Sequence, residues 1–433
     1  PRALAAGATV AAENGTAIRF RGAPRREPGP GQRGVAEFHI AAAVERDGAE
    51  ARARTLQRVG GAELVRAARL ELARMQRRVR DVALGAILNR NLLFNAFYAV
   101  ARAIDDDRVY PIVSRAPDCP PGPVFRERDA LAWSLPALLV TDSALAREVL
   151  LRALEQFSHQ PGAELHYLDG GLLSPSFSLD GFCAYALAID RYTRETGDES
   201  ILDEPIVGEV LRDLDDLILD RLHPELLLAT TEILASGELA THPYVTYDNV
   251  QLWALAGVIT RLWPRLGGGA RSNLSGAAEE IAATIWSHCT VEVDGYRLLA
   301  WSTDLEGEAA VYDDPEGSLM LLPALGFCDA DDPLWRNTVD FLHSARYPFW
   351  LGDRAFPGMA SRTWPDRASL PGLCTALLGP DPEDALALIE RLRLEGDVAC
   401  LTYDPDTGET VDGAYHAAAA GLLGWTLWQA LGR

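Results

Sequence analysis

The chain has 433 residues, 48% of them hydrophobic, so it is long enough for one large folded unit or several smaller ones. Its 62 acidic and 40 basic residues give a net charge of −22, which argues against nucleic acid or an anionic membrane surface as a partner. We therefore expect a neutral or cationic ligand.

Some chemistries are excluded by residue type. All 40 basic residues are arginines, so the chain has neither a Schiff-base lysine nor a P-loop lysine. The six cysteines form no CxxC pair and no cluster at zinc-ligand spacing. No uncharged run of about eighteen apolar residues and no signal peptide is visible, so we expect no membrane segment and a cytoplasmic location.

The first part of the chain differs from the rest. Within residues 1–48, GTAIRFRG and VAEFHIAAAVERDG alternate with the two-residue period of strands, around a loop rich in proline and glycine. Two or three strands do not form a stable sheet alone, so this β-strand segment must pack on another part or be the remnant of a larger β domain. Residues 49–83 are rich in arginine and alanine and predict an exposed linker helix.

From residue 84 to residue 433 the pattern is one of apolar helical segments separated by glycine, proline and aspartate turns. Twelve helices without intervening strands suggest six helical hairpins that close into an all-α (α/α)6 toroid. An α-solenoid would give a similar count, but the chain shows no fixed-period repeat. The predicted segments are 84–104, 127–139, 143–157, 179–196, 207–220, 248–263, 275–288, 316–326, 333–344, 368–378, 382–394 and 413–431.

Several loops combine acidic residues with aromatic residues, glycine and proline. A carbohydrate site needs this mixture, because carboxylates and amides bond to sugar hydroxyls, arginine braces the carboxylates, and aromatic faces stack on a pyranose ring. Hydrolysis of a glycosidic bond further requires two carboxyl groups. The candidate substrate-binding residues are Arg128, Asp129, Trp133, Tyr247, Asp248, Asn249, Trp301, Asp314, Trp364 and Tyr403.

Acidic residues at helix starts also have an ordinary structural role. Asp129, Asp180 and Asp248 each begin an apolar helix, where a carboxylate caps free N–H groups and complements the helix dipole for about 0.3 to 1 kcal/mol. In a toroid, however, alternate helices point the same way. Their starts would then meet at one end of the barrel, which favours a shared site over separate caps.

The order of six segments is similar to that of the six-hairpin (α/α)6 glycosidases. The segments are RDALAWSLPALLVTD, SFSLDGFCAYALAIDRYTRETGD, HPYVTYDNVQLW, DDPEGSLMLLPALGF, DPLWRNTVDFLHSARYPFW and TYDPDTGE, and they cover most of residues 85–433. The chain resembles the metal-independent α-mannosidases most, and the amylo-α-1,6-glucosidases more distantly. The resemblance implies exo-acting, inverting hydrolysis of a terminal α-linked hexose, mannose or glucose, with no metal or cofactor, and often a preceding β-sandwich.

The resemblance also implies roles for particular residues. SLDG resembles the element that carries the family's general acid, which is then Asp180. Arg128 and Asp129 resemble the Arg-Asp pair that holds sugar hydroxyls, and DDPEGS resembles an active-site loop containing Asp314 and Glu316. Because a helix start favours a charged carboxylate, burial or a neighbouring anion must keep the proton on a general acid placed there.

The chain departs from the family at the catalytic base. The family's glutamate lies in a segment resembling CE.YDP.TG, whereas this chain reads ACLTYDPDTGE, with Leu401 or Thr402 at the glutamate position. The base must then come from elsewhere, if hydrolysis is retained. The candidates are Glu316, Asp404 and Glu409.

Three further interpretations remain open. The chain is a glycan-binding homologue if the departure at the base has abolished hydrolysis. A sugar epimerase would use paired histidines, and the chain has few histidines outside the first segment and the connecting loops. A helical scaffold protein would leave the acidic and aromatic loops unexplained.

Overall fold

The computed structural model describes residues 11–12, 18–19, 39–117, 119, 121–266, 272–380 and 382–432. The chain divides into two compact units. One comprises residues 1–74 and 102–108, and the other comprises residues 75–101 and 109–433.

In the first unit, the short strands β1 (Ala11–Ala12) and β2 (Ile18–Arg19) pair in antiparallel orientation. Residues 39–45 form no strand, although they belong to a stretch with strand-like alternation. Most of the segment 1–48 lies outside the described residues, so its origin in a β-sandwich stays a prediction.

The single linker helix expected over residues 49–83 is instead two helices, α1 (Arg46–Val59) and α2 (Gly61–Met75). Gly60 separates them with φ at +84°, a conformation that other residues rarely adopt. Only the last residue of α2 is buried, and exposed Arg–Glu pairs three or four residues apart lie along both helices. The arginine-rich face is therefore solvated.

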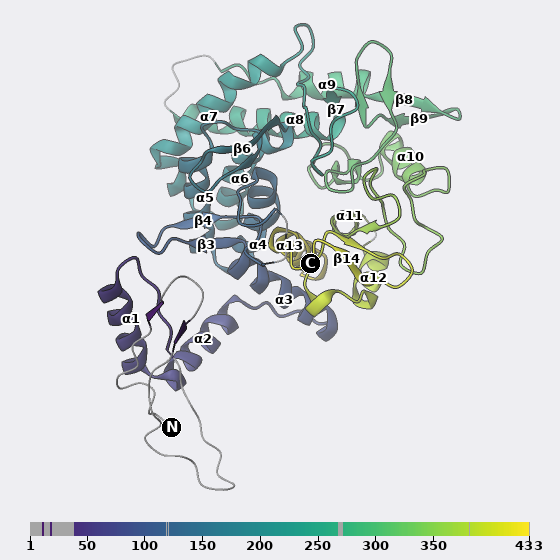
Figure 1. Cartoon of the computed structure of the whole chain (residues 1–433). Helices are drawn as coiled ribbons and strands as arrows, with labels where there is room; N and C mark the ends of the chain where they lie inside the picture. The colour runs from purple at the N-terminus through teal and green to yellow at the C-terminus, as the bar shows by residue number, and fades with distance from the viewer. Residues whose placement is uncertain are drawn as a thin grey trace. The chain divides into compact units, whose positions relative to one another are not determined.

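The second unit is built from alternating inner and outer helices. The inner helices α6, α8 and α13 are buried on nearly all sides, whereas α5, α7 and α12 each bury one stripe. The π-helical turn η1 and the helix α4 that continues it pack against α6 on one side and α13 on the other, so the last helix closes the ring (Figure 1). The helices are α3 (Val82–Tyr98), η1 (Arg128–Ser134), α4 (Leu135–Thr141), α5 (Ser143–Phe157), α6 (Leu179–Thr196), α7 (Pro205–Leu217), α8 (Thr246–Leu262), α9 (Ala278–His288), α10 (Pro333–Leu342), α11 (Leu370–Ala376), α12 (Glu383–Arg391) and α13 (Ala417–Leu431).

The prediction of a helix over residues 316–326 is wrong. This segment forms only a 3₁₀ turn, η5 (Leu319–Leu321), followed by further turns. Pro323 has no backbone N–H to donate, and Gly326 has φ at +79°. The apolar spacing resembles that of a helix, but these breakers prevent one from continuing.

Short strands lie in the loops that precede the inner helices. The strand β6 ends just before α6, β7 just before α8, β12 just before α11, and β14 shortly before α13. They belong to small sheets, with the orders β5-β6, β11-β10-β7 and β12-β13-β14, while β8 and β9 form a separate hairpin. The strands are β3 (Val100–Arg102), β4 (Val109–Pro111), β5 (Ala163–His166), β6 (Leu172–Phe177), β7 (Tyr244–Val245), β8 (Thr290–Val293), β9 (Tyr296–Leu299), β10 (Ser302–Thr303), β11 (Ala309–Ala310), β12 (Ala368–Ser369), β13 (Thr402–Tyr403) and β14 (Thr410–Asp412).

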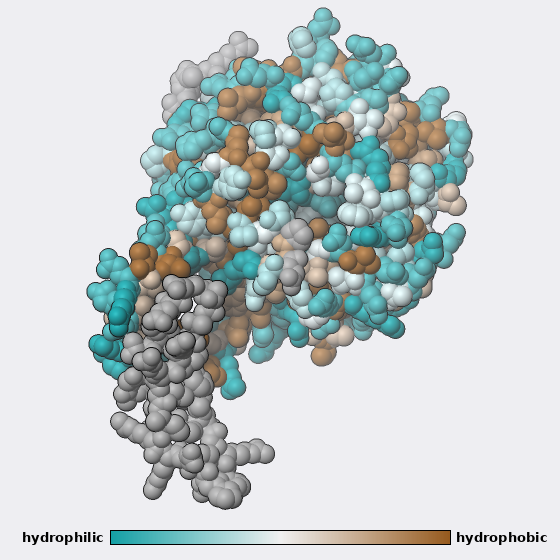
Figure 2. All heavy atoms as spheres, viewed as in Figure 1, coloured by the Kyte–Doolittle hydropathy of each residue, from teal (hydrophilic) through white to brown (hydrophobic). Residues whose placement is uncertain are grey.

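The core of the second unit consists of two hydrophobic clusters, one around α5, α6 and α8 and the other around α3, α11 and α13. The face seen in Figure 2 is a mosaic of hydrophilic and hydrophobic residues. Among the described residues, no helix has the length and apolar character needed to cross a membrane.

Candidate active site

Three acidic residues mark the starts of inner helices, as the sequence predicts. Asp129 lies in the first turn of η1, Asp180 in that of α6 and Asp248 in that of α8. Their exposed fractions are 2%, 5% and 1%, so none of them faces bulk solvent. Ordinary caps at helix starts are usually exposed to solvent, and burial of all three calls for a further explanation.

Arg128 links several of the predicted residues. Its Nη2 lies 3.0 Å from Asp129 Oδ1, and its Nη1 donates to Glu316 Oε2 at 2.6 Å. The guanidinium also lies over the ring of Trp133, 4.2 Å from its centre. Burial opposes the charge of Arg128, but the carboxylates of Asp129, Glu316 and Asp180 together raise its pKa. Residues almost 190 positions apart thus meet around one buried cation.

Asp180 is held by the start of its own helix. Ser178 is the N-cap of α6, and its hydroxyl bonds to both Gly181 N and Asp180 Oδ1. Asp180 Oδ1 also accepts the backbone N–H of Gly181 at 2.8 Å. The second oxygen, Oδ2, is buried without a hydrogen-bond partner. One oxygen is therefore anchored and the other is available to a ligand.

Asp248 is buried beside Asp180 and has neither oxygen hydrogen-bonded. Burial, followed by the charge of Asp180, raises the pKa of Asp248 well above its ordinary value. The adjacent Tyr247 accepts a hydrogen bond from Gln251 Nε2 at 2.7 Å. Burial and the two aspartates raise the pKa of Tyr247, so its hydroxyl stays protonated.

The turn at residues 313–318 places two more carboxylates. Asp313 accepts the Ser318 hydroxyl and the Leu319 N–H, and burial raises the pKa of Asp313 to about 7. Asp314 accepts the backbone N–H groups of Ser236 and Glu316, both at 3.0 Å. The turn therefore fixes the backbone of Glu316, and the side chain of Glu316 reaches the guanidinium of Arg128.

A small, partly open pocket lies next to these residues. Its lining contains two of the neighbours of Asp180 along the chain and is strongly charged. The lining residues are Arg126, Glu127, Arg128, Glu164, Ser178, Gly181, Ile233 and Ala235.

Glu127 also lines this pocket, although no motif in the sequence singled it out. Its carboxylate is buried and accepts Gly162 N at 3.0 Å and Tyr185 Oη at 2.9 Å. Its Oε2 lies 2.6 Å from the position that a Cβ on Gly181 would take, so a larger residue there would displace this carboxylate. Burial raises the pKa of Glu127, while His166 opposes this rise. The sequence signal for Glu127 was the run of four charged residues RERD, which directly precedes an apolar helix.

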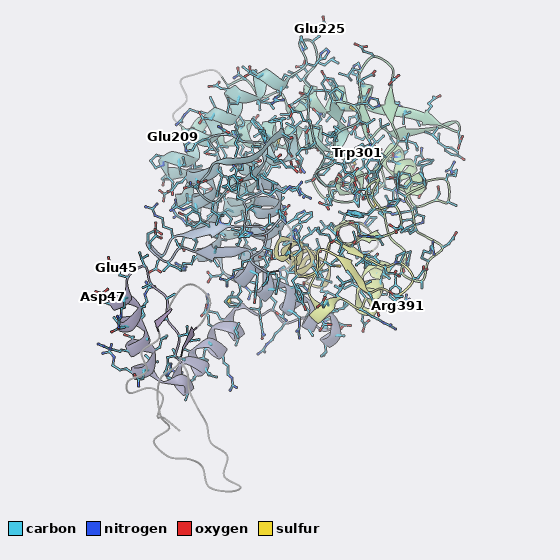
Figure 3. The ribbon with its side chains drawn as sticks, viewed as in Figure 1. Glu45, Asp47, Glu209, Glu225, Trp301 and Arg391 are labelled. Carbon is cyan, nitrogen blue, oxygen red and sulfur yellow. The ribbon has the colours of Figure 1, made fainter. Side chains whose placement is uncertain are left out.

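Three predicted substrate-binding residues belong to the framework in the structure. Asn249 bonds to the backbone N–H and C=O of Ala229 and to Val245 O. Trp301 is 1% exposed and lies among interior segments in Figure 3, whereas Glu209, Glu225 and Arg391 lie at the edge. Tyr403 is fully buried and donates to Pro357 O. Residue type suggested sugar contacts, but these side chains are used in packing and backbone bonds.

Two other predicted residues are not tied to the Arg128 cluster by any contact among the described residues. Asp404 accepts the N–H groups of Asp406 and Thr407 in the turn between β13 and β14, and these bonds lower its pKa. Trp364 is 39% exposed, with the guanidinium of Arg367 over its ring.

Where the sequence resemblance places the family's glutamate, this chain has Leu401 and Thr402, and neither carries a carboxyl group. Leu401 packs against Gly413, where a Cβ would lie 2.5 Å from Leu401 Cγ. Nearer to α13, the buried His416 is the N-cap and accepts Ala419 N at its Nδ1. Its Nε2 lies 3.7 Å from Asp129 Oδ2, and burial lowers the pKa of His416 to about 4. His416 is thus neutral and close to Asp129, and it was missed because its surroundings in the sequence are mainly alanine.

No group of three or more His, Cys, Asp or Glu residues in the described part of the chain is arranged to hold a metal ion. Several carboxylates of the candidate site are paired with arginine or bonded to backbone N–H groups. Carboxyl groups of this kind can donate or accept a proton.

Comparison with a protein family supports the sequence resemblance. The family model described as metal-independent alpha-mannosidase (GH125) matches residues 228–376. This range contains Asp248, Asp314 and Glu316. It ends before residues 401 and 402, where this chain lacks the glutamate that the resemblance leads us to expect. No curated protein matches the chain.

Solved structures share the fold. A metal-independent alpha-mannosidase of Streptococcus pneumoniae, in complex with alpha-1,6-mannobiose, is 17% identical, covers 81% of this chain and 94% of its own, and has a TM-score of 0.69. A bacterial glucoamylase complexed with acarbose is 12% identical, with 80% and 55% covered and a TM-score of 0.58. The chain thus spans about half the length of that glucoamylase. The predicted (α/α)6 toroid and the resemblance to six-hairpin glycosidases are both confirmed.

Proposed function

We propose that the protein is a glycoside hydrolase that removes a terminal α-linked hexose, mannose in preference to glucose, with inversion at the anomeric carbon. The observation that carries this proposal is Asp180, buried at the start of α6 with one oxygen unpartnered, between two residues that line a small, strongly charged pocket. The family match and the glycosidase fold support it.

In this proposal Asp180 is the general acid and Glu316 is the base. Inverting hydrolysis requires an acid that protonates the glycosidic oxygen and a carboxylate that activates a water on the opposite face of the sugar. Such carboxyl groups lie roughly 6.5 to 9.5 Å apart. Of the candidate bases, Glu316 is the one bonded to Arg128 at the pocket. Glu409 is exposed and pairs with Arg393.

Arg128 and Asp129 would hold the sugar. Burial raises the pKa of Glu316, while the adjacent guanidinium of Arg128 opposes this rise and favours the ionised form that a base needs. The ring of Trp133 packs against the guanidinium of Arg128, and the Trp133 side chain is only 4% exposed. We therefore assign Trp133 to positioning of Arg128 and not to stacking on the ligand.

One observation favours a second function, a glycan-binding protein without hydrolysis. Where the resemblance places the family's base glutamate, this chain has Leu401 or Thr402, and Leu401 packs against Gly413. If no other carboxylate replaces that base, the pocket still binds a sugar but does not cleave it.

Variants at the two proposed catalytic residues test the choice. Asp180→Asn should lower hydrolysis of an α-linked mannobiose by about 10² to 10⁴, and of an activated nitrophenyl mannoside much less, because only the poor leaving group needs protonation. Glu316→Gln should lower both rates to a similar extent. Asp304→Asn, in an exposed turn, is the matched control. Calorimetric sugar binding without turnover by the wild type would establish the second function.

A further inference from the structure

Arg126 and Glu164 form a second charged pair in the pocket, beside the cluster around Arg128. Nη2 of Arg126 lies 3.8 Å from Glu164 Oε1, and its Nη1 lies 3.9 Å from Asp129 Oδ1. At these distances the groups attract each other but form no hydrogen bond. Among the described residues, Arg126 has no hydrogen-bond acceptor, and Glu164 accepts only the Ser174 hydroxyl, at its Oε2. The donors of Arg126 and one oxygen of Glu164 are therefore available to a ligand.

This pair lies nearer to solvent than the two residues to which the terminal sugar is assigned above. The side chains of Arg126 and Glu164 are 17% and 20% exposed, whereas those of Arg128 and Asp129 are 6% and 2% exposed. When a pocket takes the end of a glycan, the terminal sugar occupies the buried part and the next sugar lies toward solvent. The difference in exposure thus favours the next sugar as the ligand of Arg126 and Glu164.

The loop between β6 and β7 lies against the charged pair. Gly237 in this loop has φ at +86°, and a Cβ there would lie 3.0 Å from Glu164 Oε1 and 3.1 Å from Arg126 Nη2. Any side chain at this position would therefore press on the charged ends of the pair. Ile233 and Ala235 of the same loop also line the pocket. The free charged groups thus lie beside an apolar wall.

This combination suits a neutral sugar. A guanidinium can only donate hydrogen bonds and a carboxylate can only accept them, so Arg126 and Glu164 together can fix two neighbouring hydroxyls of a pyranose. The apolar wall can contact the C–H groups of the ring. A phosphate or a uronic acid is disfavoured, because the carboxylates of Glu127 and Glu164 line the same pocket and repel an anion.

We propose that Arg126 and Glu164 bind the hexose on the leaving-group side of the glycosidic bond, so that the preferred substrate is a disaccharide or longer glycan and not a simple mannoside. This inference rests on the proposed function. In this role the two residues determine specificity and take no part in proton transfer. Their loss should therefore raise KM for a disaccharide and leave kcat nearly unchanged.

The first test compares an α-linked mannobiose with a nitrophenyl α-mannoside, which has no second sugar. Arg126→Met removes a hydrogen bond from a charged donor, so KM for mannobiose should rise about ten- to hundredfold. Both constants for the nitrophenyl mannoside should change less than about twofold. Glu164→Gln keeps the shape of the side chain and should show the same selectivity with a smaller effect.

Arg147→Met is the matched control. Arg147 is also partly buried in an ion pair, with Glu204 at 2.7 Å, but it lies on the outer helix α5 and does not line the pocket. This variant should treat both substrates as the wild type does. An equal loss on both substrates in Arg126→Met and in Glu164→Gln would overturn the proposal.

Mannobioses that lack one hydroxyl of the second sugar test the contact itself. Removal of the hydroxyl that Arg126 binds should weaken wild-type hydrolysis about as much as Arg126→Met does, and it should cost this variant little more. A purely structural role of Arg126 would instead make the two losses multiply for every deoxy analogue, and this result would contradict the proposal.

Calorimetry with Asp180→Asn separates this inference from the hydrolase function. This variant should bind mannobiose at least about tenfold more tightly than mannose, and the further change Arg126→Met should remove the preference. If the preference survives that change while the wild type cleaves mannobiose, the hydrolase function stands and the inference fails. If the preference depends on Arg126 but the wild type cleaves nothing, the second-sugar site stands and the hydrolase function fails.

Discussion

Replacement of Arg128 by methionine should be among the most destabilising changes at the site. Methionine retains much of the length of the side chain but removes the charge that pairs with Asp129 and Glu316. The exposed fractions of the three side chains are 6%, 2% and 16%, so Glu316 would lose its partner and Asp129 would be left with the more distant Arg126, 3.9 Å away. Breaking a buried pair in this way costs about 3 to 5 kcal/mol.

The loss of contact with Trp133 adds to this cost, since a desolvated cation over an aromatic ring contributes up to about 2 kcal/mol. With an m-value of about 3 kcal/mol per molar urea, a loss of 3 to 5 kcal/mol lowers the unfolding midpoint by about 1 to 1.7 M. Urea titration followed by tryptophan fluorescence and circular dichroism measures this shift.

The matched control is Arg354→Met. Arg354 pairs with Asp406 at 3.0 Å, but the two side chains are 51% and 60% exposed, and exposed pairs contribute about 0 to 1 kcal/mol. If Arg128→Met shifts the midpoint no more than this control, the carboxylate cluster is hydrated and the account of a buried site is refuted.

Two further predictions concern the turn at 313–318 and the loop at 364. The folded state holds a proton on Asp313 up to about pH 7, whereas the unfolded chain releases it near pH 4, so stability falls as pH rises between these values. Urea midpoints at pH 5 and pH 7 should differ less in Asp313→Asn than in wild type, and an unchanged difference would contradict this. Trp364→Ala should raise KM for mannobiose about three- to tenfold through lost stacking and leave the urea midpoint unchanged, because the ring is 39% exposed. An unchanged KM would remove Trp364 from the site.

The fold was largely predictable because burial of inner helices leaves a strong apolar pattern. Each predicted segment contains a helix except 316–326, where Pro323 and the positive φ of Gly326 override the apolar spacing. The linker was mispredicted as one helix because a glycine in a helical pattern is often tolerated, whereas Gly60 adopts a φ that ends α1.

The helix starts of the candidate site were predictable from the apolar pattern. Asp129, Asp180 and Asp248 each lie in the first turn of a buried helix, and their role in one shared site stays a prediction. The direction in which each side chain points cannot be predicted in this way. Trp301 and Tyr403 have residue types common in sugar sites, yet three-dimensional packing places both in the core. Conversely, Glu127, in the run RERD, was not selected as a site residue. The sequence alone does not show which side chain of a charged run points into the protein.

The anomer formed first from an α-linked mannoside tests the central claim most directly. Proton NMR during cleavage of mannobiose should show β-mannose before mutarotation, with this signal lost in Asp180→Asn. Appearance of α-mannose first, or equal product from Asp180→Asn, would contradict an inverting reaction that depends on the carboxyl group at the start of α6.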